Sequence, residues 1–185
     1  DGTSFDPLDI PMDPDVLLSY AQEGGFYSYV AGVAHFMRMF YHVRGLKINN
    51  YRTTLPLRKG LSSSAAITVL VARAFNLIYD LKLTVRAEME AAYQGEIRTP
   101  SRCGRMDQAC AFGQVPVAMT FDGEFIHTQR IIPGGKIQLL IADLKGHKDT
   151  VKILADLNKA YPFPEDDISR NVHHFLGKQN QNIVH

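Results

Sequence analysis

Apolar residues recur every three to four positions in several stretches of the chain, which is the spacing of one face of an α-helix. This pattern predicts a short first helix with Asp13 as its N-cap and Pro14 at the first helical position. A second predicted helix ends near Gly45. Its apolar face is marked by Tyr29, Val33, Phe36 and Phe40. Further helices are predicted over 63–80, over 84–96 with Thr84 as N-cap, over 105–113 closing at Gly113, over 149–163, and from Ile168 onward.

Other stretches alternate between apolar and polar residues or form short apolar runs, which favours β-strands. Residues 46–56 alternate and are predicted as a strand, and residues 136–146 are predicted as a buried strand. Residues 115–132 are predicted to form a β-hairpin that turns at Asp122 and Gly123. The Pro-Gly-Gly sequence at 133–135 is the clearest linker. We therefore expect one domain over residues 1–132 and the start of a second over 133–185.

Composition excludes several classes of protein. The chain has 185 residues, with 20 basic and 19 acidic side chains, so its charge gives no reason to expect nucleic acid or a membrane as partner. Its two cysteines are too few for a disulfide scaffold, and its seven histidines lack metal-ligand spacing. No apolar stretch is long enough to span a bilayer, and the first residues do not read as a signal peptide. These features predict a soluble, cytoplasmic protein.

The sequence Gly-Leu-Ser-Ser-Ser-Ala-Ala at 60–66 precedes a predicted buried helix. A helix start leaves backbone N–H groups unpaired and carries roughly half a positive charge, and small residues let a phosphate approach those groups. Serine hydroxyls add further donors and can reach Mg²⁺. The alternative is structural, because serine is a preferred N-cap and small residues help a helix to pack. The stretch does not match the P-loop pattern.

Two motifs together resemble those of the GHMP kinases, the family of galactokinase, homoserine kinase, mevalonate kinase and phosphomevalonate kinase. The sequence PLRKGLSSSAA at 56–66 resembles the family's ATP-binding loop, and its three serines are closest to the galactokinase branch. The sequence CGRMDQACAFG at 103–113 resembles a second galactokinase-type motif that follows the loop at a similar distance. The helix around 26–37 is also similar, and the likeness covers roughly residues 26–145.

The resemblance implies site residues, ATP and Mg²⁺. Asp107 would lie beside the hydroxyl that receives the phosphate and act on it, and Cys103 and Gly104 would line the acceptor pocket. Mg²⁺ would be held by Ser63, Ser64 and a glutamate, for which Glu96 is preferred and Glu90 and Glu88 are alternatives. The ATP phosphates would be held by Pro56, Gly60, Leu61, Ser62, Ser63, Ser64 and Ala65.

The chain also departs from the family pattern. Arg58 and Lys59 replace small residues before Gly60, the loop before Cys103 is two residues longer, and Arg105 stands where relatives have an apolar residue. Neither the family's N-terminal substrate motif nor its late glycine-rich motif occurs. We therefore expect a central segment of a longer kinase that is inactive alone.

The resemblance implies an α+β fold: an N-terminal domain similar to the ribosomal protein S5 domain 2-like fold, then the opening of a second α+β domain. The implied activity is transfer of the γ-phosphate of ATP to a sugar hydroxyl. Three alternatives stay open: a mevalonate- or homoserine-type kinase of a non-sugar alcohol, a catalytically silent sensor of ATP and sugar, and an α/β scaffold with no nucleotide site. The sequence specifies neither the acceptor nor the oligomeric state.

Overall fold

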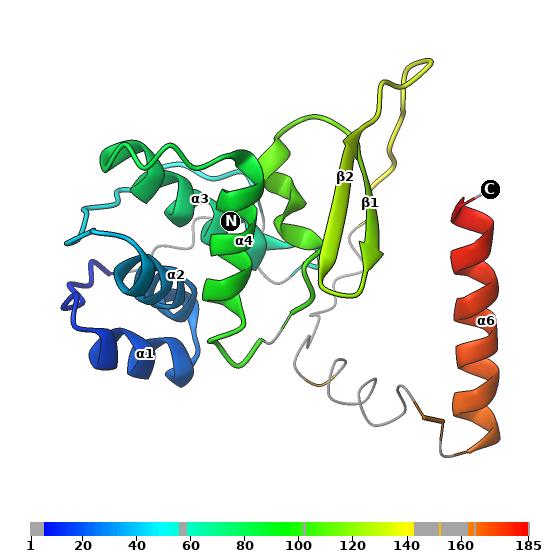
Figure 1. Cartoon of the computed structure of the whole chain (residues 1–185), viewed down its shortest axis with the longest axis horizontal. Helices are drawn as coiled ribbons and strands as arrows, with labels where there is room; N and C mark the ends of the chain where they lie inside the picture. The colour runs from blue at the N-terminus through cyan, green and yellow to red at the C-terminus, as the bar shows by residue number, and fades with distance from the viewer. Residues whose placement is uncertain are drawn as a thin grey trace. The chain divides into compact units, whose positions relative to one another are not determined.

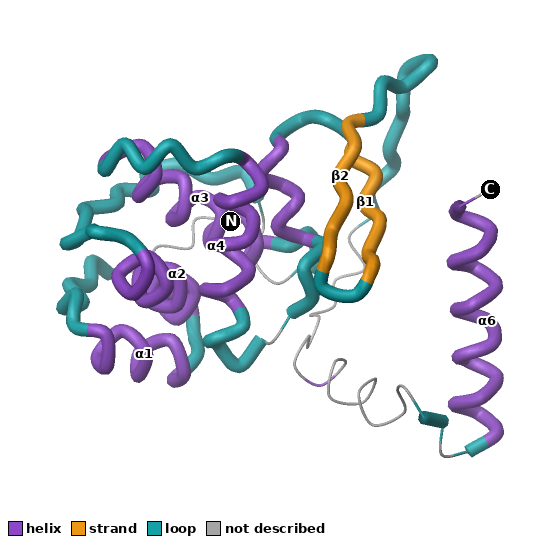
Figure 2. The backbone as a smooth tube through the Cα atoms, viewed as in Figure 1, coloured by secondary structure: helices purple, strands orange, loops and turns teal. Residues whose placement is uncertain are grey.

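Helices dominate the first part of the chain, and a two-stranded hairpin follows them (Figures 1 and 2). The computed structural model describes residues 6–55, 59–101, 103–142, 152, 163–164 and 166–184. Two units, residues 1–148 and 149–185, are distinguished and each is considered by itself. The elements of the first unit are α1 (Pro14–Glu23), α2 (Phe26–Phe40), α3 (Ser63–Ile78), α4 (Val85–Glu96), the 3₁₀ helix η1 (Asp107–Phe112), β1 (Val117–Asp122) and β2 (Phe125–Arg130). The second unit contains α6 (Asp167–Val184).

The predicted N-caps are confirmed. The Asp13 carboxylate accepts hydrogen bonds from the amides of Asp15 and Val16 at 3.0 and 3.2 Å, so α1 begins at Pro14. The Thr84 hydroxyl accepts from the amide of Ala87 at 3.3 Å and starts α4. Each cap satisfies backbone donors that have no acceptor within the helix.

The second helix is shorter than predicted. It ends at Phe40 instead of near Gly45, because Tyr41 adopts extended backbone angles. The amides of Arg44 and Gly45 then donate to the hydroxyl of Tyr79 at 3.1 and 2.8 Å. A side chain beyond the far end of α3 therefore takes over donors that a longer helix would have used.

The core lies between α2, α3 and α4, with α1 packed on α2. The backbones of helices α2 and α4 are in close contact at Gly32 and Gly95: a Cβ added at Gly32 would lie 2.3 Å from the carbonyl oxygen of Gly95. This backbone contact fixes the end of α4, where Glu96 lies. The core residues of these helices include Leu17, Ala21, Ala31, Val33, Met37, Val71, Ala72, Phe75, Met89 and Ala92.

The predicted hairpin is confirmed. Strands β1 and β2 pair antiparallel from Val117 opposite Arg130 to Asp122 opposite Phe125. The connecting residues are therefore Gly123 and Glu124, one position later than predicted, and Gly123 has a positive φ of 55°. Glycine adopts that angle without strain, as a two-residue hairpin turn requires.

Two strand predictions are wrong within the described residues, and the remaining positions of the two predicted strands, 56 and 143–146, lie outside them. Residues 46–54 are irregular, although Leu46 and Ile48 pack on the core while Lys47 and Asn49 are exposed as the alternation indicated. Residues 136–142 are also irregular, and Leu140 is 98% exposed. A strand needs a neighbouring strand for its backbone hydrogen bonds, and within the described ranges only β1 and β2 pair.

The remaining predictions concern the second unit. The helix predicted from Ile168 onward is confirmed as α6, where the Asp166 carboxylate accepts from the amide of Ser169 at 2.7 Å. The helix predicted over 149–163 lies outside the described residues, apart from Lys152 and Phe163. The domain boundary at 132/133 stays a prediction. None of the described helices has the length and apolar character to cross a membrane.

Candidate active site

The start of α3 has no side-chain cap. Its N-cap, Ser62, has left-handed backbone angles (φ 54°, ψ 42°) and makes no side-chain capping hydrogen bond. The amides of Ser63, Ser64 and Ala65 precede the first residue that can bond within the helix, so they have no helical acceptor. The capping alternative for the serines is therefore not observed at Ser62, and the helix itself does not use these three amides.

Small buried residues hold this helix start in place. Ala65 and Thr68 are fully buried, and the Thr68 hydroxyl donates to the carbonyls of Ser64 and Ala65 at 3.1 and 3.0 Å. Gly60, with a φ of 76°, and Leu61 are exposed just before the helix. The predicted phosphate-binding residue Pro56 lies outside the described residues.

Asp107 is the first residue of η1 and is half-buried. Within the described part of the chain, its carboxylate makes no hydrogen bond or ion pair. Its neighbour Gln108 is fully buried and donates from Nε2 to Glu96 Oε2 at 2.8 Å and to Cys103 Sγ at 3.2 Å. Gln108 thus joins η1, α4 and the loop before η1, a role that sequence analysis missed because nothing in the Asp-Gln pair indicates a distant partner.

The other end of η1 is held by Arg73 of α3, which sequence analysis also missed. Its Nη2 donates to the carbonyl of Ala111 at 2.7 Å and to Glu88 Oε2 at 2.7 Å. Asn76 donates to the second oxygen of Glu88 at 2.7 Å. Both α3 and α4 therefore pack against η1 through named contacts as well as through apolar residues.

The three candidate glutamates have different environments. Glu88 is 5% exposed and accepts hydrogen bonds from Arg73 and Asn76. Glu90 accepts from Gln94 at 2.9 Å and pairs with Arg105 at 3.4 Å. Glu96, whose carboxylate reaches η1 through Gln108, is the one nearest in sequence and contact to Asp107.

The oxygen chemistry and exposure of these residues bear on Mg²⁺. Ser63 and Ser64 are half-buried hydroxyls and suit a hard cation that keeps several waters. Glu96 is only 1% exposed and accepts from Gln108, so its carboxylate is closed to a hydrated ion in this conformation. In the described segments, no three His, Cys, Asp or Glu side chains are grouped to hold a metal.

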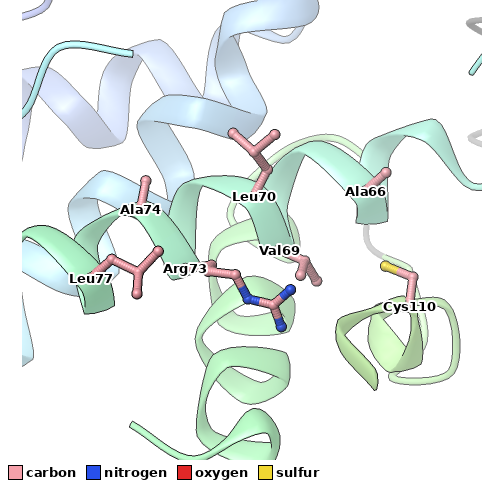
Figure 3. Close-up of a pocket in the computed structure, with 7 residues that line it drawn as sticks. All are labelled: Ala66, Val69, Leu70, Arg73, Ala74, Leu77 and Cys110. Carbon is pink, nitrogen blue, oxygen red and sulfur yellow. The ribbon is translucent and has the colours of Figure 1, made fainter. Parts of the chain in front are cut away.

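A groove of about 460 Å³ runs along α3 (Figure 3). Ala66, in the first turns of α3, and Cys110 of η1 lie near each other at one end, and Leu77 lies at the other. The first turns of α3 and η1 are thus neighbours, and each of the two motifs contributes one residue to the groove. The groove is lined by Ala66, Val69, Leu70, Arg73, Ala74, Leu77 and Cys110.

The predicted acceptor-pocket residues differ in exposure, because Gly104 is exposed while Cys103 is half-buried. Burial, and after it the negative charge of the nearby Glu96 carboxylate, raise the pKa of the Cys103 thiol to about 12. The thiol is therefore neutral at physiological pH and unsuited to nucleophilic attack.

This pKa predicts slow alkylation. In a Cys110→Ser chain, iodoacetamide at pH 8 should label Cys103 at least about a hundredfold more slowly than in the denatured chain, because only the thiolate reacts. The rate should rise about tenfold per pH unit up to the folded pKa. Mass spectrometry measures both, and labelling at the denatured rate would contradict the buried thiol.

Comparison with known proteins identifies the class of this domain. The family model described as GHMP kinases N terminal domain matches residues 28–114, a range that contains the serine loop, α4 and η1. Residues 28–114 therefore match the GHMP kinase N-terminal domain family, and the resemblance found in the sequence is confirmed.

Among curated proteins, the chain is similar to the galactokinases of Thermotoga petrophila and Thermotoga sp. (strain RQ2). Each is 32% identical over 123 residues, which cover 63% of this chain and 35% of the relative. The chain thus spans about a third of the length of these relatives. No solved structure matches the chain significantly.

Proposed function

We propose that this protein is an ATP-dependent small-molecule kinase of the galactokinase type, which transfers the γ-phosphate to a sugar hydroxyl. The family match and the galactokinase relatives support the class of reaction. One observation carries the proposal: an uncapped helix start at Ser63 lies on a helix that packs beside η1, where the Asp107 carboxylate has no partner among the described residues.

The chain's residues suit the tasks of phosphoryl transfer, which are to hold the phosphates, neutralise charge and orient the acceptor. Gly60 and the amides and hydroxyls of residues 62–65 would bind the phosphates. Asp107 would orient or deprotonate the acceptor hydroxyl. Cys103 and Gly104 would border the acceptor.

Mg²⁺, when bound with ATP, supplies positive charge that offsets the phosphate oxygens. The hydroxyls of Ser63 and Ser64 would hold it from the side of α3. Glu96 would contribute only if Gln108 released its carboxylate, so this residue positions η1 in the present conformation. Its role as a metal ligand remains a proposal.

The finer fold assignment belongs to the same proposal. The described first unit is α+β with a two-stranded sheet. We propose that in the complete gene product the sheet is larger, as in the S5 domain 2-like fold, and that residues 133–185 open a second α+β domain. We also propose that residues 1–185 are inactive alone, since they cover about a third of the length of the relatives.

The first test is a phosphoryl-transfer assay on the complete gene product with labelled ATP, Mg²⁺ and a panel of sugars and non-sugar alcohols. We expect a phosphorylated sugar and ADP in equal amounts. Transfer only to a mevalonate- or homoserine-type alcohol would show that the acceptor is a non-sugar alcohol and not a sugar. ATP and sugar binding without ADP formation would instead support a silent sensor.

The phosphate-binding role of the serine loop is tested by Ser63→Leu. A bulky side chain should block the approach of phosphates to the open amides and weaken ATP binding at least about tenfold, or about 1.4 kcal/mol. The matched control is Ser19→Leu on the exposed face of α1. Calorimetry measures both affinities, and equal affinities would remove the helix start from the nucleotide site.

A further inference from the structure

Arg105 fastens the loop before η1 to two other elements. Its Nη1 donates to the Glu124 carbonyl at 3.0 Å and pairs with Glu124 Oε2 at 3.0 Å. Its Nη2 pairs with Glu90 Oε1 at 3.4 Å, and its guanidinium lies over the ring of Tyr93, 4.7 Å from the centroid. One side chain thus links the loop to α4 and to the turn of the β1–β2 hairpin.

The individual ion pairs of Arg105 contribute little stability and do not by themselves explain an arginine at this position. The Glu124 side chain is 87% exposed, so solvent screens its charge. The carbonyl contact and the stacking on Tyr93 depend instead on the planar guanidinium, which presents several donors in fixed directions. The planar shape of the Arg105 guanidinium therefore matters more than its charge, because an ammonium group cannot make all of these contacts at once.

Arg105 is largely covered by protein and borders a cavity of about 180 Å³ beside Glu90 and Glu124. Its side chain is 21% exposed, and its Nε is buried without a hydrogen-bond partner in the described structure. The guanidinium is enclosed by α4 and the hairpin turn. An effect of Arg105 on catalysis would have to pass through another residue.

That residue is Asp107, which lies between two anchored neighbours. Arg105 holds the chain two positions before it, and Gln108 holds the chain one position after it, on Glu96 and Cys103. Asp107 itself has no bond to another described residue. The backbone around Asp107 is therefore held by the anchors on either side, and a small displacement of a reacting group is costly in rate.

We propose that Arg105 is a positioning residue that aims the Asp107 carboxylate at the phosphoryl acceptor by clamping the loop between α4 and the hairpin turn. This inference rests on the proposed kinase function. It predicts that loss of the guanidinium lowers the rate of the chemical step. ATP binding, which depends on α3, should stay unchanged.

The test uses Arg105→Met and Arg105→Lys in the complete gene product, with Arg170→Met on the exposed α6 as matched control. We expect Arg105→Met to lower kcat about 10- to 100-fold with the KM for ATP within about twofold of wild type. Lysine should rescue little of the loss, because it keeps the charge and loses the planar fork. Arg170→Met should behave as wild type.

A second comparison separates positioning from general weakening of the fold. Adding Arg105→Met to an Asp107→Asn protein should lower kcat no further, because residues that act as a unit are not additive. An additive loss, a changed KM for ATP in place of kcat, or a folded Arg105→Met protein with wild-type kcat would each overturn the proposal.

Failure of the proposed function gives a different result. If the wild-type protein phosphorylates no alcohol, the proposed kinase function is wrong. The proposed effect of Arg105 on catalysis is then wrong as well. Hydrogen exchange still tests the clamp itself: the amides of residues 103–108 should exchange faster in Arg105→Met than in wild type. Unchanged exchange would overturn the clamp.

Discussion

Replacing Asp107 with Asn in the complete gene product is expected to lower kcat by about 10²- to 10⁴-fold, the usual contribution of a general acid or base. The amide has the size of the carboxylate but cannot accept the hydroxyl proton. Since the Asp107 carboxylate bonds to no other described residue, the substitution should leave the fold intact. ATP binding through the start of α3 should stay within about twofold of wild type.

Steady-state kinetics and ATP calorimetry on the same preparation measure the two effects. Asp80→Asn is the matched control, because that carboxylate is 76% exposed and pairs only locally with Lys82. It should leave both quantities unchanged. Near-normal turnover by Asp107→Asn would remove this residue from the mechanism, and lost ATP binding would show that the two motifs are not independent.

Gly95→Ala is expected to lower the free energy of unfolding by about 3 kcal/mol, at the upper end for overpacking. The added Cβ would lie 2.4 Å from Val33 Cγ2 and 2.7 Å from the backbone nitrogen of Val33. The side-chain methyl can rotate away, but the backbone of α2 can relieve the clash only if α2 and α4 move apart. Because Glu96 follows directly, the separation should also loosen its contact with Gln108.

Thermal unfolding followed by circular dichroism measures this effect on the chain itself. A loss of about 3 kcal/mol corresponds to a melting temperature about 6–12 °C lower for a protein of this size. Gly134→Ala is the control, since an added Cβ there meets no atom within 4 Å, and it should change stability by less than about 0.5 kcal/mol. Equal melting temperatures for both variants would contradict the close helix contact.

The helices were predictable because their signals are local. Asp13 and Thr84 cap amides two or three residues away, so the sequence around each helix start contains both partners. The end of α2 was mispredicted because it depends on Tyr79, which is 34 and 35 residues from the amides it accepts. No pattern within the helix carries that information.

The strands illustrate the same limit. The alternation at 46–49 does match which side chains pack on the core, but a strand also requires a partner, and pairing is a property of distant segments. The hairpin was predictable because its partner is adjacent and a glycine marks the turn. Residues 136–142 lack such a neighbour among the described segments.

For the site, the motifs indicated Ser63 and Asp107 but not how they are supported. The contacts of Arg73 with Ala111 and of Gln108 with Glu96 span 38 and 12 residues, and neither residue type is unusual in a helix. The three glutamates look equivalent in the sequence. The structure distinguishes them by their partners, since Glu88 pairs with Arg73 and Glu90 pairs with Arg105.

The most direct measurement is a crystal structure of the complete gene product with Mg²⁺ and a non-hydrolysable ATP analogue. We predict that the phosphates lie on the amides of Ser63, Ser64 and Ala65, and that the terminal phosphate faces the Asp107 carboxylate across a space that admits one hydroxyl. A nucleotide bound elsewhere, or side chains filling the start of α3 while Asp107 points away from the terminal phosphate, would contradict it.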